Sequence, residues 1–282
     1  MYLHILQSPL TWLVPPRART VSYSNTTQEE EKIDKDKIIM ERLHGTLREK
    51  ITWWDDPCTS MTTFRYRQRQ RQRHSFSTKN PLWNTRIQIL SDIANAMEYL
   101  HSKNIILRDL KSENAGFDIN GKIKLFDFGL ATALRNENKV GPDRYNFSVD
   151  GGTLRYMSPE AANGDPYGKA TDVYSFALLA WETLSLSIPF ASMSTEEFIH
   201  RVIEKRSRPK LNPKWPKYLK ALIAKSWATN ASYRPSFQQI QRQLDTSLVL
   251  RSSEKKGRTD PDAENNVQQS NSCLLWLGRC RS

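Results

Sequence analysis

Residues 105–129 read IILRDLKSENAGFDINGKIKLFDFG, and this stretch decides the fold. Its apolar start, residues 105–107, predicts a short strand, and the polar residues after it predict a loop. A hairpin is expected next, because Asn120 and Gly121 both tolerate the positive φ of a tight turn between two strands. The hairpin should bring the loop before it close to the Asp-Phe-Gly after it.

Four polar side chains in this stretch form a chemically meaningful set. Asp109 and Lys111 lie in Arg-Asp-Leu-Lys. Asn114 follows in the same loop, and Asp127 follows the returning strand. Phosphoryl transfer from a nucleotide needs a carboxylate that orients the attacking hydroxyl, a cation that meets the growing charge, and oxygen ligands for magnesium. Ordinary turn aspartates are the alternative, but both motifs at this spacing, with the lysine and the asparagine, favour chemistry.

These two motifs resemble those of the eukaryotic protein kinase superfamily. The resemblance implies that Asp109 is the catalytic base and that Lys111 stabilises the transition state. It also implies that Asn114 and Asp127 hold Mg²⁺ and, through the metal, ATP. The reaction would be phosphoryl transfer to hydroxyl groups of protein substrates.

Two positions in the stretch depart from the family pattern. Leu107 replaces the usual histidine before Arg-Asp. It can fill the same apolar slot, but it loses an imidazole hydrogen bond. Ala115 and Gly116 replace two large aliphatic residues that help to floor the adenine pocket, so this floor is expected to be thin.

The small lobe is the part of the kinase fold for which this sequence offers the fewest residues. Residues 37–43 resemble the strand that enters the hinge between the lobes, which leaves residues 1–37 for the small lobe. Five strands and a helix need roughly 55 residues. Residues 1–37 contain no glycine, so the glycine-rich loop over the phosphates is missing, and so is the strand with the phosphate-binding lysine. A truncated small lobe is predicted, either real or the result of a misread gene. The apolar residues 1–16 are read as a stray strand, a weak anchor or, in the favoured interpretation, a misread start of the gene.

The rest of the chain predicts the helices of a large lobe. One helix begins at Asn80-Pro81 and has an apolar face made of Ile87, Leu90, Ile93, Ala94, Met97 and Leu100. Residues 172–184 are apolar nearly all round, so this helix should be buried. By resemblance, its Asp172 braces the catalytic loop. Start signals of three further helices lie at Ser194, Pro216 and Ser236.

Residues 131–151 are polar, lack periodicity and resemble an activation loop. Hydroxyl groups that could accept phosphate there or just beyond are those of Tyr145, Ser148 and Thr153. For Tyr145 and Ser148, ordinary loop hydroxyls are the favoured interpretation. Arg108 would supply the counter-charge, since arginine can meet phosphate through two hydrogen bonds. Residues 152–160, GTLRYMSPE, resemble the loop that seats the acceptor, and Lys111 together with Thr153 matches the serine/threonine kinases.

Two further motifs, Asp-Val-Tyr-Ser-Phe and Arg-Pro-Ser-Phe, look most like those of the tyrosine-kinase-like serine/threonine group. The arginine of the second motif is Arg234. By resemblance it pairs with Glu160 in the interior.

The net charge of +12 is partly local, because an Arg-Gln run at residues 65–73 supplies five arginines. This run lies in a long polar connection, residues 51–80, that contains a basic insertion at about 56–79. A disordered, solvated insertion is the main interpretation. A nucleic-acid patch or nuclear address is the alternative, since basic runs can bind phosphate without sequence preference.

Three scattered cysteines, Cys58, Cys273 and Cys280, lack metal-ligand spacing and indicate free thiols in a reducing compartment. No apolar run reaches the ~18 residues of a membrane span. The apolar start lacks the features of a signal peptide. These observations favour the cytoplasm, with the nucleus as the alternative, and leave the oligomeric state undefined.

Together these features predict a mainly α protein (α+β overall) built as a protein-kinase-like large helical lobe with a truncated small lobe. The expected parts are an N-terminal remnant or disordered segment (1–37), a domain of hinge and large lobe (38–248), and a disordered tail (249–282). The predicted function is MgATP-dependent phosphorylation of serine and threonine in protein substrates. A kinase-like scaffold with weak or no catalysis is the first alternative. A nucleic-acid-associated protein using the Arg-Gln run is the second and less favoured one.

Overall fold

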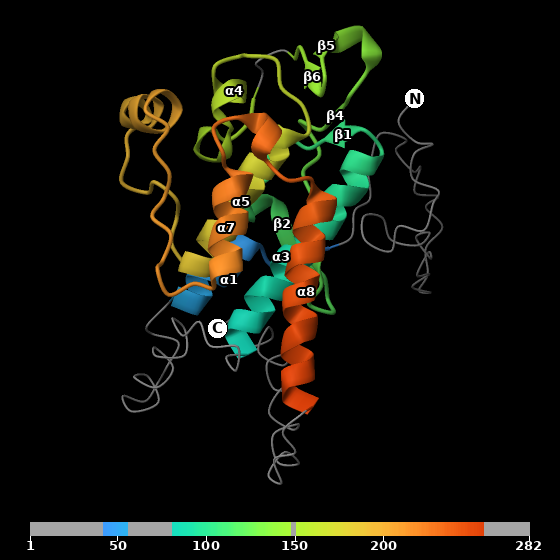
Figure 1. Ribbon diagram of the computed structural model, residues 1–282, viewed down its shortest axis with the longest axis vertical. Coiled ribbons are helices and arrows are strands. Elements are labelled where there is room, and N and C mark those ends of the chain that lie inside the picture. The colour runs from blue at the N-terminus through green and yellow to red at the C-terminus, as the bar shows by residue number, and fades with distance from the viewer. Residues whose placement is uncertain (1–41, 56–80, 148–150, 257–282) are drawn as a thin grey trace, which may run out of the picture.

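A computed structural model describes residues 42–55, 81–147 and 151–256, and Figure 1 shows the arrangement of its elements. Helices dominate these residues, which confirms the mainly helical fold. The longer helices are α1 (Leu47–Asp55), α3 (Pro81–Ser102), α5 (Ala170–Ser185), α7 (Lys217–Ser226) and α8 (Phe237–Lys256). Two single-turn helices complete the set, α4 (Pro159–Ala162) and α6 (Thr195–Phe198). None of the helices in the described ranges is both long and apolar enough to cross a membrane.

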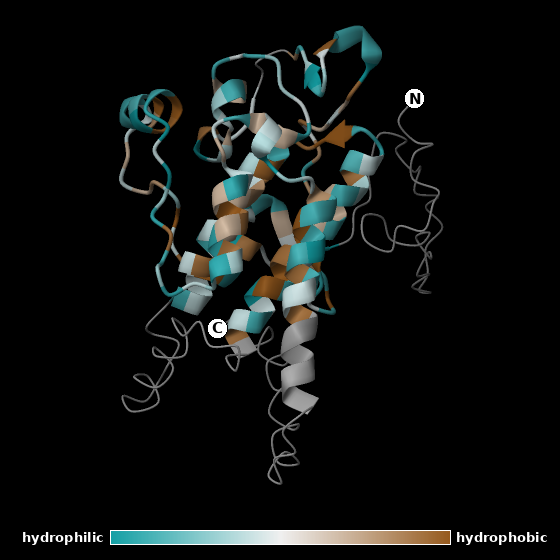
Figure 2. Ribbon diagram, viewed as in Figure 1, coloured by the Kyte–Doolittle hydropathy of each residue, from teal (hydrophilic) through white to brown (hydrophobic). Residues whose placement is uncertain are grey.

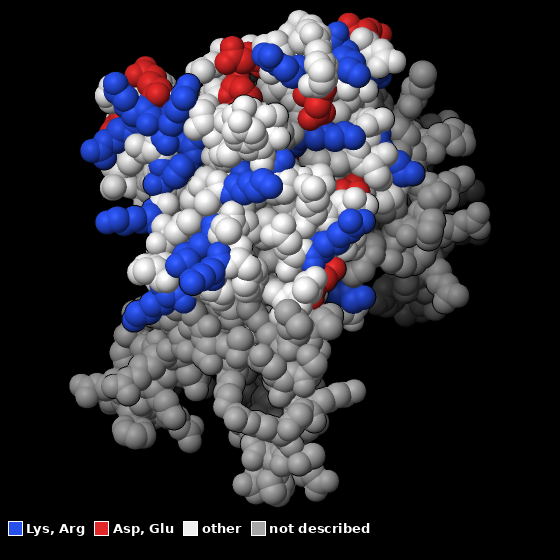
Figure 3. All heavy atoms as spheres, in the orientation of Figure 1, with Lys and Arg blue, Asp and Glu red and all other residues white. Residues whose placement is uncertain are grey.

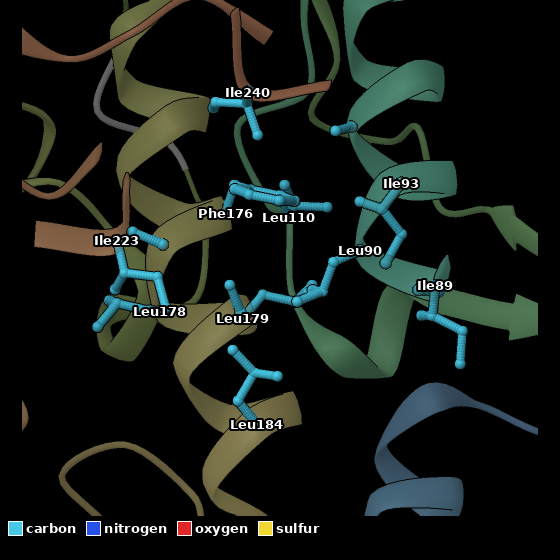
Figure 4. Packing of buried hydrophobic residues seen from close by; sticks show 14 of the residues in the cluster. Ile89, Leu90, Ile93, Leu110, Phe176, Leu178, Leu179, Leu184, Ile223 and Ile240 are labelled. Carbon is cyan, nitrogen blue, oxygen red and sulfur yellow. The ribbon is translucent and has the colours of Figure 1, made fainter. Parts of the chain in front are cut away.

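The core lies where α3, α5 and α8 meet, and Figure 2 shows apolar residues gathered along their inner sides. α3 packs along α8 and also contacts α5. Every residue of the predicted α3 face is buried. In Figure 4, Leu90 and Ile93 of α3 point toward Phe176 and Leu179 of α5. The prediction that the helix after residue 170 is buried is confirmed, because almost every residue of α5 is inaccessible to solvent.

The strands are short and pair two by two. β1 (Ile105–Ile106) pairs antiparallel with β4 (Thr132–Ala133). β2 (Ala115–Phe117) pairs with β3 (Ile123–Leu125), which confirms the predicted hairpin. Gly121 provides the left-handed residue of its turn at φ +75°, and Asp118 accepts hydrogen bonds from the N–H groups of Asn120 and Lys122. This hairpin sets the distance between the loop before β2 and the segment after β3.

The structure adds order to two segments that the sequence predicts to be irregular. Residues 51–55 belong to α1, because Leu47, Ile51 and Trp54 lie on one buried side of that helix. The polar segment after Gly129 contains a second hairpin, β5 (Lys139–Gly141) with β6 (Arg144–Tyr145). The prediction of a structureless connection from residue 51 is therefore wrong for its first five residues.

The helix starts predicted at Pro81, Pro216 and Ser236 are confirmed. Ser236 and Gln239 form a reciprocal capping box, because each side chain accepts a hydrogen bond from the other residue's N–H. α8 then continues to Lys256, past the expected domain boundary at residue 248. The predictions for residues 1–41, 56–80, 148–150 and 257–282, including the small lobe and the Arg-Gln run, lie outside the described residues.

Candidate active site

Asp109 is the centre of a closed set of hydrogen bonds. One of its oxygens, Oδ2, accepts from Lys111 Nζ at 2.6 Å and from Asn114 Nδ2 at 3.0 Å. The other, Oδ1, accepts from the N–H of Thr153 at 2.9 Å. Burial alone would raise the pKa of Asp109, but the hydrogen bonds from Lys111 and Thr153 outweigh burial and hold the pKa below its usual value. The carboxylate is therefore ionised at neutral pH and held in one orientation.

Residues 107–114 are called the catalytic loop here, after the kinase resemblance. Lys111 joins this loop to the loop that follows residue 150. Its Nζ donates to Asp109 Oδ2 and also to Thr153 Oγ1 at 2.7 Å. The Thr153 hydroxyl, one of the predicted phosphate acceptors, is thus a partner of this lysine. Tyr145, another predicted acceptor, is buried in β6, and Ser148 lies outside the described residues. The Arg108 guanidinium lies 5.5 Å from the ring centre of Phe147 and donates from Nη1 to Thr132 Oγ1 at 3.4 Å.

Asn114 and Asp127 flank the β2–β3 hairpin, with Asn114 directly before β2 and Asp127 two residues after β3. The N–H of Phe126 donates to the carbonyl of Asn114 at 3.0 Å. Asp127 is the next residue in the chain after Phe126. The Asp127 backbone is left-handed, with φ +59°, and its carboxylate is exposed. The Asn114 amide nitrogen donates to the carbonyl and the carboxylate of Asp109. This orientation commits the nitrogen and makes the amide oxygen the atom of that side chain that can bind a cation.

This donor set suits magnesium. Mg²⁺ takes oxygen ligands, and at nucleotide sites it is usually held by one or two protein side chains together with phosphates and water. An exposed carboxylate and an oriented amide oxygen fit that pattern. No group of three His, Cys, Asp or Glu that could enclose a metal occurs in the described parts of the chain. One carboxylate and one amide oxygen leave most of the coordination sphere to phosphates and water, so the residues fit a metal that arrives with a nucleotide.

Asp172, in the first turn of α5, holds the backbone at the start of the catalytic loop. Its two oxygens accept from the N–H groups of Leu107 and Arg108, each at 2.9 Å. This contact holds Arg108 in a left-handed conformation with φ +70°. Leu107 is fully buried, as expected for an apolar slot. An imidazole still reaches Asp172, because His101 of α3 lies 2.8 Å from Oδ2. The bracing role predicted for Asp172 is confirmed.

With this geometry established, the chain can be compared with known proteins. Residues 31–244 match the family described as protein tyrosine and serine/threonine kinase. The chain belongs to this kinase family. Its relatives include the serine/threonine/tyrosine-protein kinase HT1 of Arabidopsis thaliana, 36% identical over 55% of this chain and 38% of its own length. The dual specificity protein kinase zakA of Dictyostelium discoideum is 30% identical over 72% of this chain and 25% of its own length. The chain thus spans well under half the length of these relatives.

The kinase domain also contains a buried polar network that the sequence analysis missed. Glu182, in the middle of the apolar helix α5, has a fully buried side chain. It accepts hydrogen bonds from Tyr156 Oη and from Ser112 Oγ, and it forms an ion pair with Arg48 Nη1 at 2.7 Å. Arg48 also donates to Glu113 at 2.7 Å. One carboxylate therefore ties α1, the catalytic loop and the acceptor-seating loop together. The available signal was Glu182 itself, an acidic residue among the mostly apolar residues in the middle and second half of α5.

Burial of Glu182 raises its pKa to about 7, despite the opposing hydrogen bond from Tyr156 and the charge of Arg48. Between about pH 4.5 and 7 the folded kinase holds this proton and the unfolded chain does not, so stability falls as the pH rises through that window. In the wild type, the free energy of unfolding should fall by about 2–4 kcal/mol as the pH rises through this window. In Glu182→Gln this fall should be absent. Urea unfolding at pH 5, 6, 7 and 8 measures this, with Glu137→Gln at an exposed position as control. Parallel pH profiles for wild type and Glu182→Gln would contradict the assignment.

Gly116 occupies the position where the kinase resemblance predicts a thin adenine floor. A Cβ atom at Gly116 would lie 2.7 Å from Leu43 Cδ1 and 3.1 Å from Phe126 Cε1. The space of the missing aliphatic side chain is therefore taken by these two side chains. The Gly116 backbone also bridges to Thr46, which adds the segment before α1 to the edge of the β2–β3 hairpin.

The predicted interior pair of the kinase lobe is confirmed. Arg234 donates to both oxygens of Glu160, with 2.9 Å between Nη2 and Oε2. It also donates to the carbonyls of Ala170 and Ala228. Its side chain is fully buried and that of Glu160 is 18% exposed. The pair fixes the end of the acceptor-seating loop to the segment before α8, and the bond from Arg234 to Ala170 adds the first residue of α5.

Proposed function

We propose that this kinase domain transfers the γ-phosphoryl group of MgATP to serine or threonine hydroxyls of protein substrates. The observation that carries the proposal is the joint contact of Asp109 with Lys111, Asn114 and Thr153. It brings the predicted base, the predicted cation and the acceptor-seating loop within hydrogen-bonding distance of one another. Membership of the kinase family supports the reaction class. The choice of serine and threonine rests on the bond between Lys111 and Thr153.

The proposed chemistry follows from these groups. Asp109 is ionised because its pKa is held below the usual value, so it can accept the hydrogen bond and then the proton of an acceptor hydroxyl. The positive charge of Lys111 lies beside the Asp109 carboxylate. There it would stabilise the negative charge that develops on the transferred phosphoryl group. Thr153 positions the acceptor loop against the base through its N–H. ATP with Mg²⁺ would supply the phosphoryl group.

The proposed metal ligands are the carboxylate of Asp127 and the amide oxygen of Asn114. We expect MgATP to raise the melting temperature of the wild-type protein by several degrees, since a ligand at 100 times its Kd adds about 2.7 kcal/mol to stability. Asp127→Asn should abolish this shift, because it removes the only full negative charge that these two ligands supply. Thermal unfolding with ATP, with and without Mg²⁺, measures the effect.

Asp165→Asn is the matched control for that experiment, because Asp165 is an exposed aspartate of the same lobe. It should keep the full shift. A wild-type protein whose melting temperature does not respond to MgATP would favour the alternative function, a kinase-like scaffold without useful turnover. We place the proposed activity in the cytoplasm, where a chain with scattered cysteines keeps them as thiols.

A further inference from the structure

A basic surface follows α6 and covers α7. It consists of seven side chains, six of which are exposed and one, Lys220, half-buried: Lys205, Arg206, Lys210, Lys214, Lys217, Lys220 and Lys225. On α7 the opposite side of the helix is apolar and buried, with Leu219, Leu222 and Ile223 in the core. Figure 3 shows the side chains of Lys and Arg spread over this part of the visible face, with acidic groups mainly near its upper edge. We call these seven side chains the basic surface.

The loop and the helix that carry the basic surface lie next to each other. Arg208, just after the first two cations, donates from Nε to the carbonyl of Trp227 at the end of α7. Lys220 Nζ donates to the carbonyl of Pro213, in the loop before the helix. The loop before α7, residues 205–216, therefore runs alongside the helix, and the chain then turns back to form α7. This places the loop cations and the helix cations on one surface.

The charge of this surface is unbalanced. Residues 198–230 contain nine Lys or Arg against one acidic residue, Glu204. Together with the five arginines of residues 65–73, this segment carries a net charge of +13, so the rest of the chain is close to neutral. No carboxylate of the described residues lies within ion-pair distance of the seven side chains, and Glu204 pairs with His200 instead. A solvated face usually mixes both signs, whereas a surface of one sign attracts a partner of the other.

We infer that the basic surface docks an acidic, extended segment of a protein substrate. The inference rests on the proposed function, because it makes the surface a second point of attachment for the molecule to be phosphorylated. The three cations of α7 span nine residues, a rise of about 12 Å, which matches about four residues of extended peptide. Attachment there raises the local concentration of the acceptor at the catalytic loop.

The composition of the surface favours a protein over a nucleic acid. Single strands bind where bases can stack on exposed aromatic rings. The tryptophans of the segment, Trp215 and Trp227, are buried in the core, and Tyr218 is half-buried. Six of the seven cations are lysines, which lack the planar fork that arginine offers to phosphate. Carboxylates need only the point charge that lysine supplies.

The test uses the full chain with the five arginines of residues 65–73 replaced by glutamine, so that the other basic run does not bind the probe. The probe is a fluorescein-labelled peptide of alternating glutamate and serine, followed by anisotropy without nucleotide. Reversing Lys217, Lys220 and Lys225 to glutamate should weaken binding at least tenfold. Reversing Lys50, Lys103 and Arg242, three exposed cations elsewhere, changes the net charge equally and should weaken it less than threefold.

Equal weakening by the two triple variants would overturn the inference, since binding would then follow net charge alone. Tighter binding of a uridine oligonucleotide or of phosphatidylserine vesicles, lost in the Lys217/Lys220/Lys225 variant, would overturn the choice of a protein partner. Because the assay needs no nucleotide, it separates the two proposals. Docking without any phosphoryl transfer would refute only the proposed function. If transfer occurs, an acidic extension on an acceptor peptide should lower its KM at unchanged kcat, and only in chains with the basic surface intact.

Discussion

Asp109→Asn should lower the rate of phosphoryl transfer by about 10²–10⁴-fold, because it removes the proposed base and the charge that accepts the proton. Asparagine has nearly the same shape as aspartate, and its amide oxygen can still accept from the N–H of Thr153. Lys111 and Asn114 lose Oδ2 as an acceptor, but Lys111 keeps Thr153 Oγ1 and Asn114 keeps the carbonyl of residue 109, so the fold should survive. Alanine would also leave the N–H of Thr153 without its acceptor. Initial rates of protein phosphorylation at saturating MgATP measure the effect, together with the melting temperature.

The control for this variant is Asp165→Asn, which changes an exposed carboxylate in the same way. Its rate should stay within twofold of wild type. An Asp109→Asn protein that is folded and fully active would refute the role proposed for Asp109. A folded variant that lost activity but still gained stability from MgATP would support the separation of the base from the metal ligands.

Glu160→Ala should cost about 3–5 kcal/mol of unfolding free energy, because it leaves the Arg234 guanidinium buried without a counter-charge. Urea unfolding at neutral pH measures this loss. The matched control is Glu137→Ala, which breaks the pair with Arg135, where both side chains are more than 60% exposed. That variant should cost less than about 1 kcal/mol.

The double variant Glu160→Ala with Arg234→Met distinguishes an unpaired charge from a general packing defect. Replacing both ends of a buried pair removes the uncompensated cation, so the double variant should be no less stable than Glu160→Ala alone. Equal losses for Glu160→Ala and Glu137→Ala would contradict the assignment of an interior pair.

The sequence predicts the parts of this kinase that depend on local pattern. The apolar residues of α3 recur at helical spacing, α5 lacks a polar face, and Asn120-Gly121 marks the turn between β2 and β3. These elements bring Lys111 and Asn114 into contact with Asp109, and Phe126, the residue before Asp127, donates its N–H to the carbonyl of Asn114. The four candidate residues could be proposed from the sequence because they lie within one continuous stretch, whereas Thr153, which also donates to Asp109, lies outside it.

The missed features depend on pairs that are distant in the sequence. Arg48, Glu113 and Glu182 come from three separate elements, and the sequence does not show that their side chains pair with one another. The filling of the space at Gly116 by Leu43 requires a strand-like segment that only the tertiary fold places there. β5 and β6 are too short to show an alternating pattern. Periodicity cannot report contacts of this kind.

The hydrogen bonds from the catalytic loop to Asp172 have a consequence for how inherited or engineered changes in this protein should be judged. The same helix that fills the centre of the lobe also sets the backbone of Leu107 and Arg108, directly before Asp109. A substitution that shifts α5 by a fraction of an ångström would misalign the Asp109 carboxylate, the proposed base, while the protein still melts at a normal temperature. Loss of turnover in a soluble, folded variant therefore does not locate the damage in the cleft.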